Sequence, residues 1–197
     1  MPPKRETTRE SILSAALCIV EDQGIDAVSA RSVAQRLRCS TQPIYSLFDS
    51  MDTLRREVWH LALEEAQSHI RGHHDDRYLP ELQLIIGYYD LARTRKALFR
   101  SVYQSTVSAQ HPESVTVGRE MLTQHLARSE RLRSLPADGF GRVVLVLTVF
   151  INGLATMLNT GTLDTTLDQA ADLTAEVYTM AVMKERARMR MEEMDHV

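Results

Sequence analysis

Residues 28–54 read VSARSVAQRLRCSTQPIYSLFDSMDTL and contain two short helical patterns separated by a brief turn. The first pattern starts at Ser29, whose hydroxyl can cap a helix. The second starts at Ser40, another capping residue, and Pro43 then falls in a first turn, where its missing N–H loses no hydrogen bond. It ends near Phe48. Two short helices joined by a turn of three or four residues are the layout of a helix-turn-helix.

Helical patterns continue on both sides of this segment. Thr7 and Glu10 have the spacing of a capping box, and apolar residues recur at helical intervals after them, which predicts a helix over about 8–23. A longer helix is expected over about 49–71, where Asp49 and Ser50 supply the cap. The polar run that follows indicates the main loop of the chain.

The remainder of the chain is also helical in pattern. Pro80 opens a helix, and a division falls near Arg95. Further helices are expected over 112–133, 140–158 and 163–193. With about nine helices in all, we predict an N-terminal three-helix domain over residues 1–54 and a larger helical domain over residues 55–197.

The composition favours an all-α fold. The chain has 197 residues, 44% of them hydrophobic, with 8 glycines and 6 prolines, too few for a sandwich rich in tight turns. Cys18 and Cys39 lack metal spacing, which is typical of a reduced cytoplasmic protein. No secretory signal is expected, and the apolar stretch over 143–158 falls short of the about 20 residues that cross a bilayer, so no membrane span is expected either.

The charge distribution limits how the chain could bind nucleic acid. The formal net charge is −3, and residues 1–60 carry equal numbers of basic and acidic side chains. DNA affinity depends on clustered basic groups rather than on the overall sum. Any DNA-binding surface must therefore keep its positive groups on one face.

The spacing within residues 28–54 resembles that of the TetR (tetracycline-repressor) family of transcriptional regulators, and the resemblance covers about residues 8–54. The positions that carry it are Ser29, Arg31, Val33, Ala34, Leu37, Ser40, Tyr45, Phe48 and Leu54. It implies that the second short helix enters the DNA major groove while the first braces it. It also implies a divergent helical ligand domain in the rest of the chain.

The resemblance implies DNA contacts for individual residues. Tyr45 would bind a phosphate, and the start of the second helix would meet bases and backbone through Ser40, Thr41, Gln42 and Pro43. Gln42 is the best base reader by chemistry, because its amide can pair bidentately with adenine. The Thr41 methyl or Pro43 can meet a thymine methyl.

The first helix would contribute Ser29 and Arg31 as phosphate anchors. Two positions depart from the family pattern. Arg38 stands where glycine is common in the turn, so it can supply positive charge to DNA, but its backbone must tolerate the turn. Met51 stands where lysine is common, which leaves only backbone N–H groups to hold a phosphate there.

The larger domain is predicted to hold a dimer contact and a ligand pocket. The run over 143–151 is apolar on every face of a helix and needs cover from several sides. The resemblance implies that the last two long helices pair with their copies in a four-helix bundle, whereas an intramolecular core is the alternative. A small organic effector would bind among aromatic and small polar residues. The candidate lining residues are Tyr88, Tyr89, Phe99, Tyr103, Gln104, Thr148 and Asn152.

Together these features predict a homodimeric, ligand-responsive repressor that binds a palindromic double-stranded DNA operator. One alternative is a helical ligand-binding or scaffold protein whose helix-turn-helix makes protein contacts, and the neutral N-terminal domain favours it. An enzyme is not expected, because no catalytic constellation stands out. No cofactor or metal site is expected, since consecutive residues such as the His-His-Asp-Asp run at 73–76 rarely converge on one ion.

Overall fold

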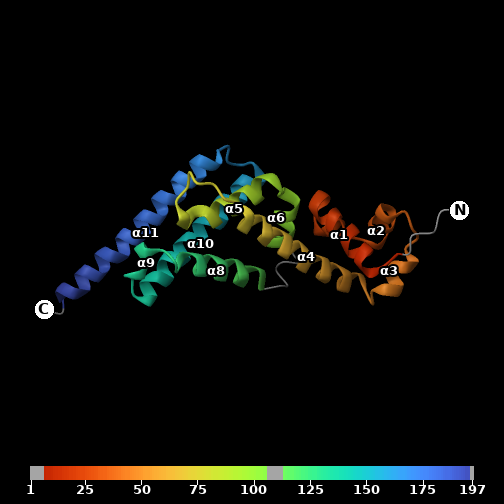
Figure 1. Ribbon diagram of the computed structural model, residues 1–197, viewed down its shortest axis with the longest axis horizontal. Helices are drawn as coiled ribbons and strands as arrows, with labels where there is room; N and C mark the ends of the chain where they lie inside the picture. The colour runs from red at the N-terminus through yellow and green to blue at the C-terminus, as the bar shows by residue number, and fades with distance from the viewer. Residues whose placement is uncertain (1–6, 106–112, 196–197) are drawn as a thin grey trace. The chain divides into compact units, whose positions relative to one another are not determined.

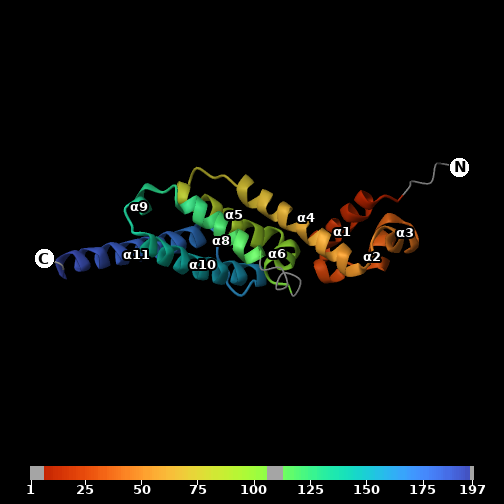
Figure 2. The ribbon, with the colours of Figure 1, turned by 90° about the horizontal axis from the view of Figure 1, so that it is seen from below.

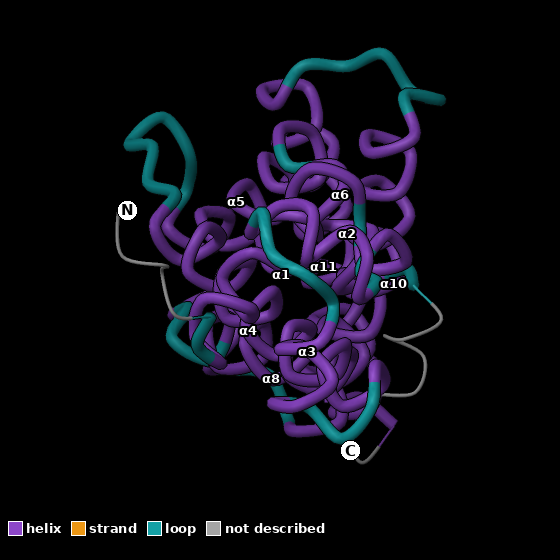
Figure 3. Tube along the Cα trace, turned by 90° about the vertical axis from the view of Figure 1, so that its right-hand side faces the viewer, coloured by secondary structure: helices purple, strands orange, loops and turns teal. Residues whose placement is uncertain are grey.

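The computed structural model describes residues 7–105 and 113–195, and within them the secondary structure consists of helices and connecting loops (Figures 1 and 3). The α-helices are α1 (Arg9–Gln23), α2 (Ala30–Leu37), α3 (Gln42–Leu47), α4 (Met51–Gly72), α5 (Gln83–Thr94), α6 (Lys96–Tyr103), α8 (Glu113–Leu126), α9 (Glu130–Arg133), α10 (Ala137–Thr160) and α11 (Leu167–Asp195). Two short 3₁₀ helices are η1 (Ile25–Ala27) and η2 (Pro80–Leu82). The all-α prediction is confirmed.

The chain folds into two compact units. Unit 1 comprises Met1–Ser68 and Arg95–Ser114, and unit 2 comprises His69–Thr94 and Val115–Val197. Unit 1 therefore contains α1 to α3, most of α4, and α6, while unit 2 contains α5, most of α8, and α9 to α11. The boundary after residue 54 that the sequence suggests lies inside α4 and inside unit 1, and it stays a prediction.

In unit 1, α6 is bonded to η1, the short helix that follows α1. The backbone N–H of Ile25 donates a buried 2.9 Å hydrogen bond to the Ser101 hydroxyl of α6. That hydroxyl donates in turn to the carbonyl of Ala97, at 2.7 Å. Arg95, just before α6, forms ion pairs with Glu21 of α1 and Glu65 of α4. These links hold η1 and α1 against α6, because the buried N–H of Ile25 and the guanidinium of Arg95 both find partners there.

The start of α1 differs by one residue from the expected capping box. Thr8, not Thr7, is the cap, and its reciprocal partner is Ser11 rather than Glu10. A serine hydroxyl at the third helical position can bind the cap's N–H as a glutamate does, so the helix starts one residue later. Glu10 lies in the first turn, where hydrogen bonds from the backbone lower the pKa of its carboxyl.

The two caps expected in the helix-turn-helix have different outcomes. Ser29 caps α2 as predicted, in a capping box with Ser32. Ser40 does not cap α3, because the residue before that helix is Thr41, and neither hydroxyl makes a capping hydrogen bond. Pro43 at the second helical position lacks one of the N–H groups that a cap would bind, which explains the loss.

The core of unit 2 lies where α10 packs against α5 and α11 (Figures 1 and 2). Val143, Leu147 and Ile151 form the buried side of α10. Near the start of α10, Arg142 donates two hydrogen bonds to the buried Glu185 of α11, at 2.7 and 3.0 Å. These hydrogen bonds lower the pKa of the Glu185 carboxyl, because the guanidinium favours its charged form.

The single helix expected over 112–133 is wrong, because the chain breaks between α8 and α9. Ser129 is buried in the break. Its hydroxyl donates to Glu81 at 2.8 Å and lies 3.2 Å from the hydroxyl of Tyr178. A serine hydroxyl engaged by distant partners competes with helical geometry, and this explains the turn.

Helix α10 is longer than the apolar stretch that the sequence indicates. Its 24 residues include an 18-residue window with a mean hydropathy of 1.9, so by length and composition it could cross a bilayer. The core helix of a soluble bundle has the same properties, and 44% of that window is buried inside the protein. The absence of a membrane span stays a prediction.

Candidate nucleic-acid interface

Helix α3 is anchored on one side and open to solvent on the other. Ile44 and Phe48 are 0% and 3% exposed, whereas Tyr45 between them is 61% exposed. The two buried side chains fix the rotation of a helix that is only six residues long. Tyr45 therefore points away from the core, as the sequence indicates.

Arg9 of α1 holds the end of α3 in place, a role that the sequence does not reveal. Its guanidinium lies 4.3 Å from the centre of the Phe48 ring and donates a 2.8 Å hydrogen bond to the carbonyl of Leu47. It also forms an ion pair with Glu57 of α4. The last turn of α3 is thus bound to α1 and, through Arg9, linked to α4, which gives the short helix a fixed direction.

The turn between α2 and α3 has a left-handed residue at Arg38, with φ 55° and ψ 43°. Among the described residues it is the one non-glycine residue with positive φ. The left-handed region brings Cβ close to the backbone and costs about 1 kcal/mol for a residue other than glycine. The expectation that Arg38 must tolerate a turn suited to glycine agrees with this geometry.

We expect Arg38→Gly to raise the free energy of unfolding by about 1 kcal/mol, because glycine adopts this conformation without the Cβ clash. Urea denaturation followed by circular dichroism measures the change. Arg38→Ala is the matched control, since it removes the same charge but keeps Cβ and should leave stability near that of the wild type. Equal stability of the glycine and alanine variants would contradict a strained turn.

Some basic side chains near the motif are engaged by partners. Arg36 pairs with Asp22 at 2.8 Å, and Arg55 donates to the carbonyl of Val28 at 3.0 Å. Arg31 and Arg38 are exposed and form no ion pair within the part of the chain that the structure describes. The equal charge count over residues 1–60 therefore hides positive groups that are available on the helix-turn-helix.

The other predicted DNA contacts have different surroundings. Ser40, Thr41 and Gln42 are exposed at the start of α3, and Pro43 is half-buried. The Ser29 hydroxyl is already engaged, since it accepts from the N–H of Ser32 at 3.1 Å and donates to its hydroxyl at 3.0 Å. A phosphate contact from Ser29 would have to share or replace the second of these bonds.

Comparison with known proteins connects this geometry to one group of folds. No family model and no curated protein matches the sequence. A solved structure described as a transcriptional regulator of Pseudomonas aeruginosa matches 91% of this chain and 92% of its own, with a TM-score of 0.65 and 14% identity. A TetR-family protein of Vibrio parahaemolyticus matches 88% of this chain and 97% of its own, with a TM-score of 0.61 and 17% identity.

The chain has the TetR-family fold. The Pseudomonas aeruginosa protein MexZ, described as a repressor responsible for antibiotic resistance, also shares it, with a TM-score of 0.62, 13% identity and coverage of 88% of this chain and 94% of that one. The resemblance noted over about residues 8–54 thus extends, as a fold, through both units. In this fold α2 and α3 are the two short helices that the sequence predicts as a helix-turn-helix.

The expected effector residues in unit 2 take part in hydrogen bonds among the described residues. Tyr88 donates to the side-chain carbonyl of Asn152 at 3.0 Å. Tyr89 is fully buried, its hydroxyl lies 2.9 Å from that of Thr174, and burial raises its pKa. The Thr148 hydroxyl donates to its own helix, at the carbonyl of residue 144. These residues act as packing and helix contacts here, and an effector role for them stays a prediction.

The three remaining effector candidates belong to unit 1. Phe99 is buried on α6, and its ring centre lies 5.4 Å from that of Tyr103. Gln104 follows directly at the end of the same helix, where its N–H donates to the carbonyl of Arg100 at 2.9 Å. Their role as a ligand wall also stays a prediction.

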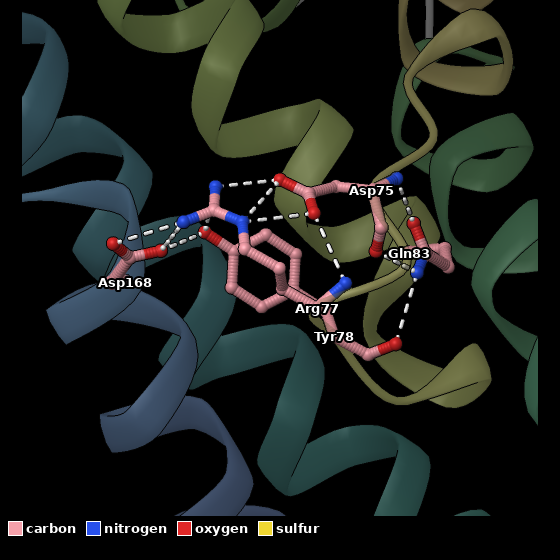
Figure 4. A network of polar contacts seen from close by, with 5 residues as sticks. All are labelled: Asp75, Arg77, Tyr78, Gln83 and Asp168. Atoms are coloured by element: carbon pink, nitrogen blue, oxygen red, sulfur yellow. Dashed lines mark hydrogen bonds and ion pairs between the residues drawn. The ribbon is translucent and has the colours of Figure 1, made fainter.

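The histidine-rich loop after α4 is fixed by a polar network (Figure 4). The guanidinium of Arg77 lies between the carboxylates of Asp75 and Asp168, with contacts of 2.6 and 3.1 Å. These hydrogen bonds lower the pKa of Asp75 to about 2. Tyr78 donates to Asp168. Burial is the larger cause and this hydrogen bond the second cause that together raise the pKa of Tyr78 to about 12. Gln83 of α5 donates to the carbonyls of Asp75 and Tyr78, so the loop is tied to α5 and α11.

Metal binding gains no support in this loop. Within residues 7–105 and 113–195, no three His, Cys, Asp or Glu side chains are grouped so that they could hold an ion. His74 instead pairs with Asp76 at 2.9 Å. The loop does border a cavity that sequence reasoning missed, because the residues lining it come from three separate segments.

Proposed function

We propose that this protein is a DNA-binding transcriptional regulator, a cytoplasmic homodimeric repressor that releases a palindromic operator when a small molecule binds. The observation that carries the proposal is the outward face of α3 within a TetR-family fold. Tyr45 and the start of α3 are exposed while Ile44 and Phe48 hold the helix from behind. A helix presented in this way can enter a major groove with its first residues against base edges.

In this proposal Tyr45 binds a phosphate through its hydroxyl, and Gln42 reads a base through its amide. Arg31 and Arg38 supply positive charge beside the groove, since neither is neutralised by a neighbouring acid among the described residues. Met51 begins α4, and the backbone N–H groups of Met51 and Asp52 can hold a second phosphate, since that of Thr53 is bound to the Ser50 hydroxyl at 3.1 Å.

The dimer is supported by apolar side chains on the outer faces of the last two long helices. On α10, Leu145 and Val149 are 55% and 67% exposed, and on α11, Met180 and Met183 are 61% and 64% exposed. Large apolar side chains gathered on one surface of a soluble protein mark an interaction site. A two-fold pairing of α10 and α11 would cover them and set two recognition helices about 34–36 Å apart, one turn of DNA.

Fluorescence anisotropy on duplex DNA from upstream of the protein's own gene tests the proposal, with a random duplex library as the second substrate. We expect saturable, competitor-resistant binding whose logarithm falls linearly with the logarithm of salt concentration, by about 0.9 for each phosphate neutralised. Absence of binding to both substrates at low salt, with the protein folded, would leave the protein-contact reading of the helix-turn-helix in its place.

A further inference from the structure

A cavity of about 600 Å³ opens in unit 2 between the end of α4, the first turn of α5 and α8. Its volume falls in the range of small-molecule sites. Ile70, Leu84 and Met121 give it an apolar part, and the rest of the lining is polar. None of the seven effector candidates named from the sequence lines it.

Positive groups outnumber negative ones around this cavity. Arg71 and Arg128 line it, and Glu120 is the one acid among the lining residues. Arg128 is exposed, and its side chain has no ion pair or hydrogen bond within the described part of the chain. Glu81 and Glu130 line an adjoining cavity together with Arg128, but neither forms an ion pair with it among the described residues, so its guanidinium keeps donors for an anion.

His73 adds a polar atom that lacks a partner. Its Nε2 is buried and makes no hydrogen bond among the described residues, although the residue lines the cavity. A buried polar atom left without a partner is unfavourable, because it has lost its hydrogen bond to water and gained no other. A ligand oxygen in the cavity could bond to this nitrogen once the imidazole ring turns toward the cavity, and that bond would remove the cost.

The position of His73 depends on a close approach between α4 and α5. A Cβ built at Gly87 would lie 2.4 Å from the carbonyl oxygen of Ile70 and 3.0 Å from the Cβ of His73. Only glycine permits this contact, which presses α5 against the end of α4. On the other side, Gln83 and Asp75 fasten the loop by a 3.0 Å hydrogen bond from the Asp75 N–H (Figure 4). The wall that carries His73 is therefore formed before any ligand binds.

We propose that this cavity binds a small organic anion, whose carboxylate or phosphate group contacts Arg128 and His73 while its body lies against Leu84 and Met121. This inference rests on the proposed function in one respect, since it assigns the cavity as the effector site of the regulator. The loop that carries His73 is held by the Asp75–Gln83 hydrogen bond and by the close approach at Gly87, so this wall is in place before the anion binds.

Isothermal titration calorimetry of the full chain with paired probes tests the charge preference. The anions are benzoate, hexanoate and phenyl phosphate, and their neutral counterparts are benzamide, hexanamide and phenol. We expect at least one anion to bind at least about tenfold more tightly than its counterpart, as a charge-assisted hydrogen bond requires. The carboxylate and phosphate arms distinguish which anionic group fits. Failure of all three anions to bind at millimolar concentration would overturn the proposal.

Two variants place the binding in this cavity. Arg128→Gln is expected to weaken the best anion about tenfold, whereas Arg133→Gln, an exposed arginine that does not line the cavity, is the matched control and should leave affinity unchanged. The imidazole nitrogen resonances of His73, assigned with His73→Gln, should shift on titration. Equal affinities of the two arginine variants, or an unmoved His73 signal, would overturn the site.

Operator binding by the same samples, measured without probe, separates this inference from the proposed function. Anion binding by a protein that binds no DNA would contradict the proposed regulatory function and support the anion site. DNA binding by a protein that binds none of the anions would contradict the anion site and support the proposed regulatory function. Anion binding that leaves operator affinity unchanged would remove the effector role.

Discussion

The Tyr45→Phe variant is expected to bind its operator about 100-fold more weakly than the wild-type protein, because each protomer of the dimer loses one hydrogen bond to a charged phosphate. The side chain is 61% exposed, and its hydroxyl has no partner within the described residues. Stability should therefore change by no more than about 0.5 kcal/mol. Fluorescence anisotropy and urea denaturation of the same preparation measure the two quantities.

Tyr78→Phe is the matched control, since it removes a tyrosine hydroxyl that bonds to Asp168 in unit 2. It should leave operator affinity at the wild-type value. An equal loss in both variants would point to a general effect on folding, and an unchanged affinity of Tyr45→Phe would remove the phosphate role.

Val149→Glu is expected to raise the dissociation constant of the dimer at least about 100-fold, because a two-fold interface would bury one unpaired carboxylate from each subunit. Val149 is the most exposed large apolar residue of α10. Light scattering coupled to size exclusion measures the oligomeric state, and operator affinity should fall with it, since a single recognition helix contacts only one half-site.

Ala137→Glu adds the same charge to an exposed position in the first turn of α10, where a carboxylate suits the helix dipole. This control should remain dimeric. A dimeric Val149→Glu variant would place the subunit contact on another surface of the protein.

The local signals of the helix-turn-helix were sufficient to predict the cap of α2 and the outward face of α3, but not the residue at which α3 starts. Ser29 caps α2 because its partner is three residues away, and the exposure of Tyr45 follows from the apolar neighbours that must face inward. The first residue of α1 was harder to predict, because the capping box forms at Thr8 if Ser11 binds the cap N–H and at Thr7 if Glu10 does.

Features that depend on distant partners were not predictable. The break between α8 and α9 follows from Ser129 bonding to Glu81, which is 48 residues earlier in the chain. Arg9 reaches the carbonyl of Leu47 across 38 residues. The spacing of apolar residues along the sequence carries no information about such contacts. The cavity is hidden for the same reason, because His73 and Arg128 become neighbours of one space only after three segments pack together.

The hydrogen bond from Ile25 to Ser101 responds differently to small and to large rotations of α6. A small rotation of α6 keeps the bond, because a hydroxyl can turn to follow its donor. A larger one would leave a buried N–H without an acceptor, at a cost of about 1–3 kcal/mol. The contact between η1 and α6 should therefore tolerate minor motion of α6 and resist a larger rotation.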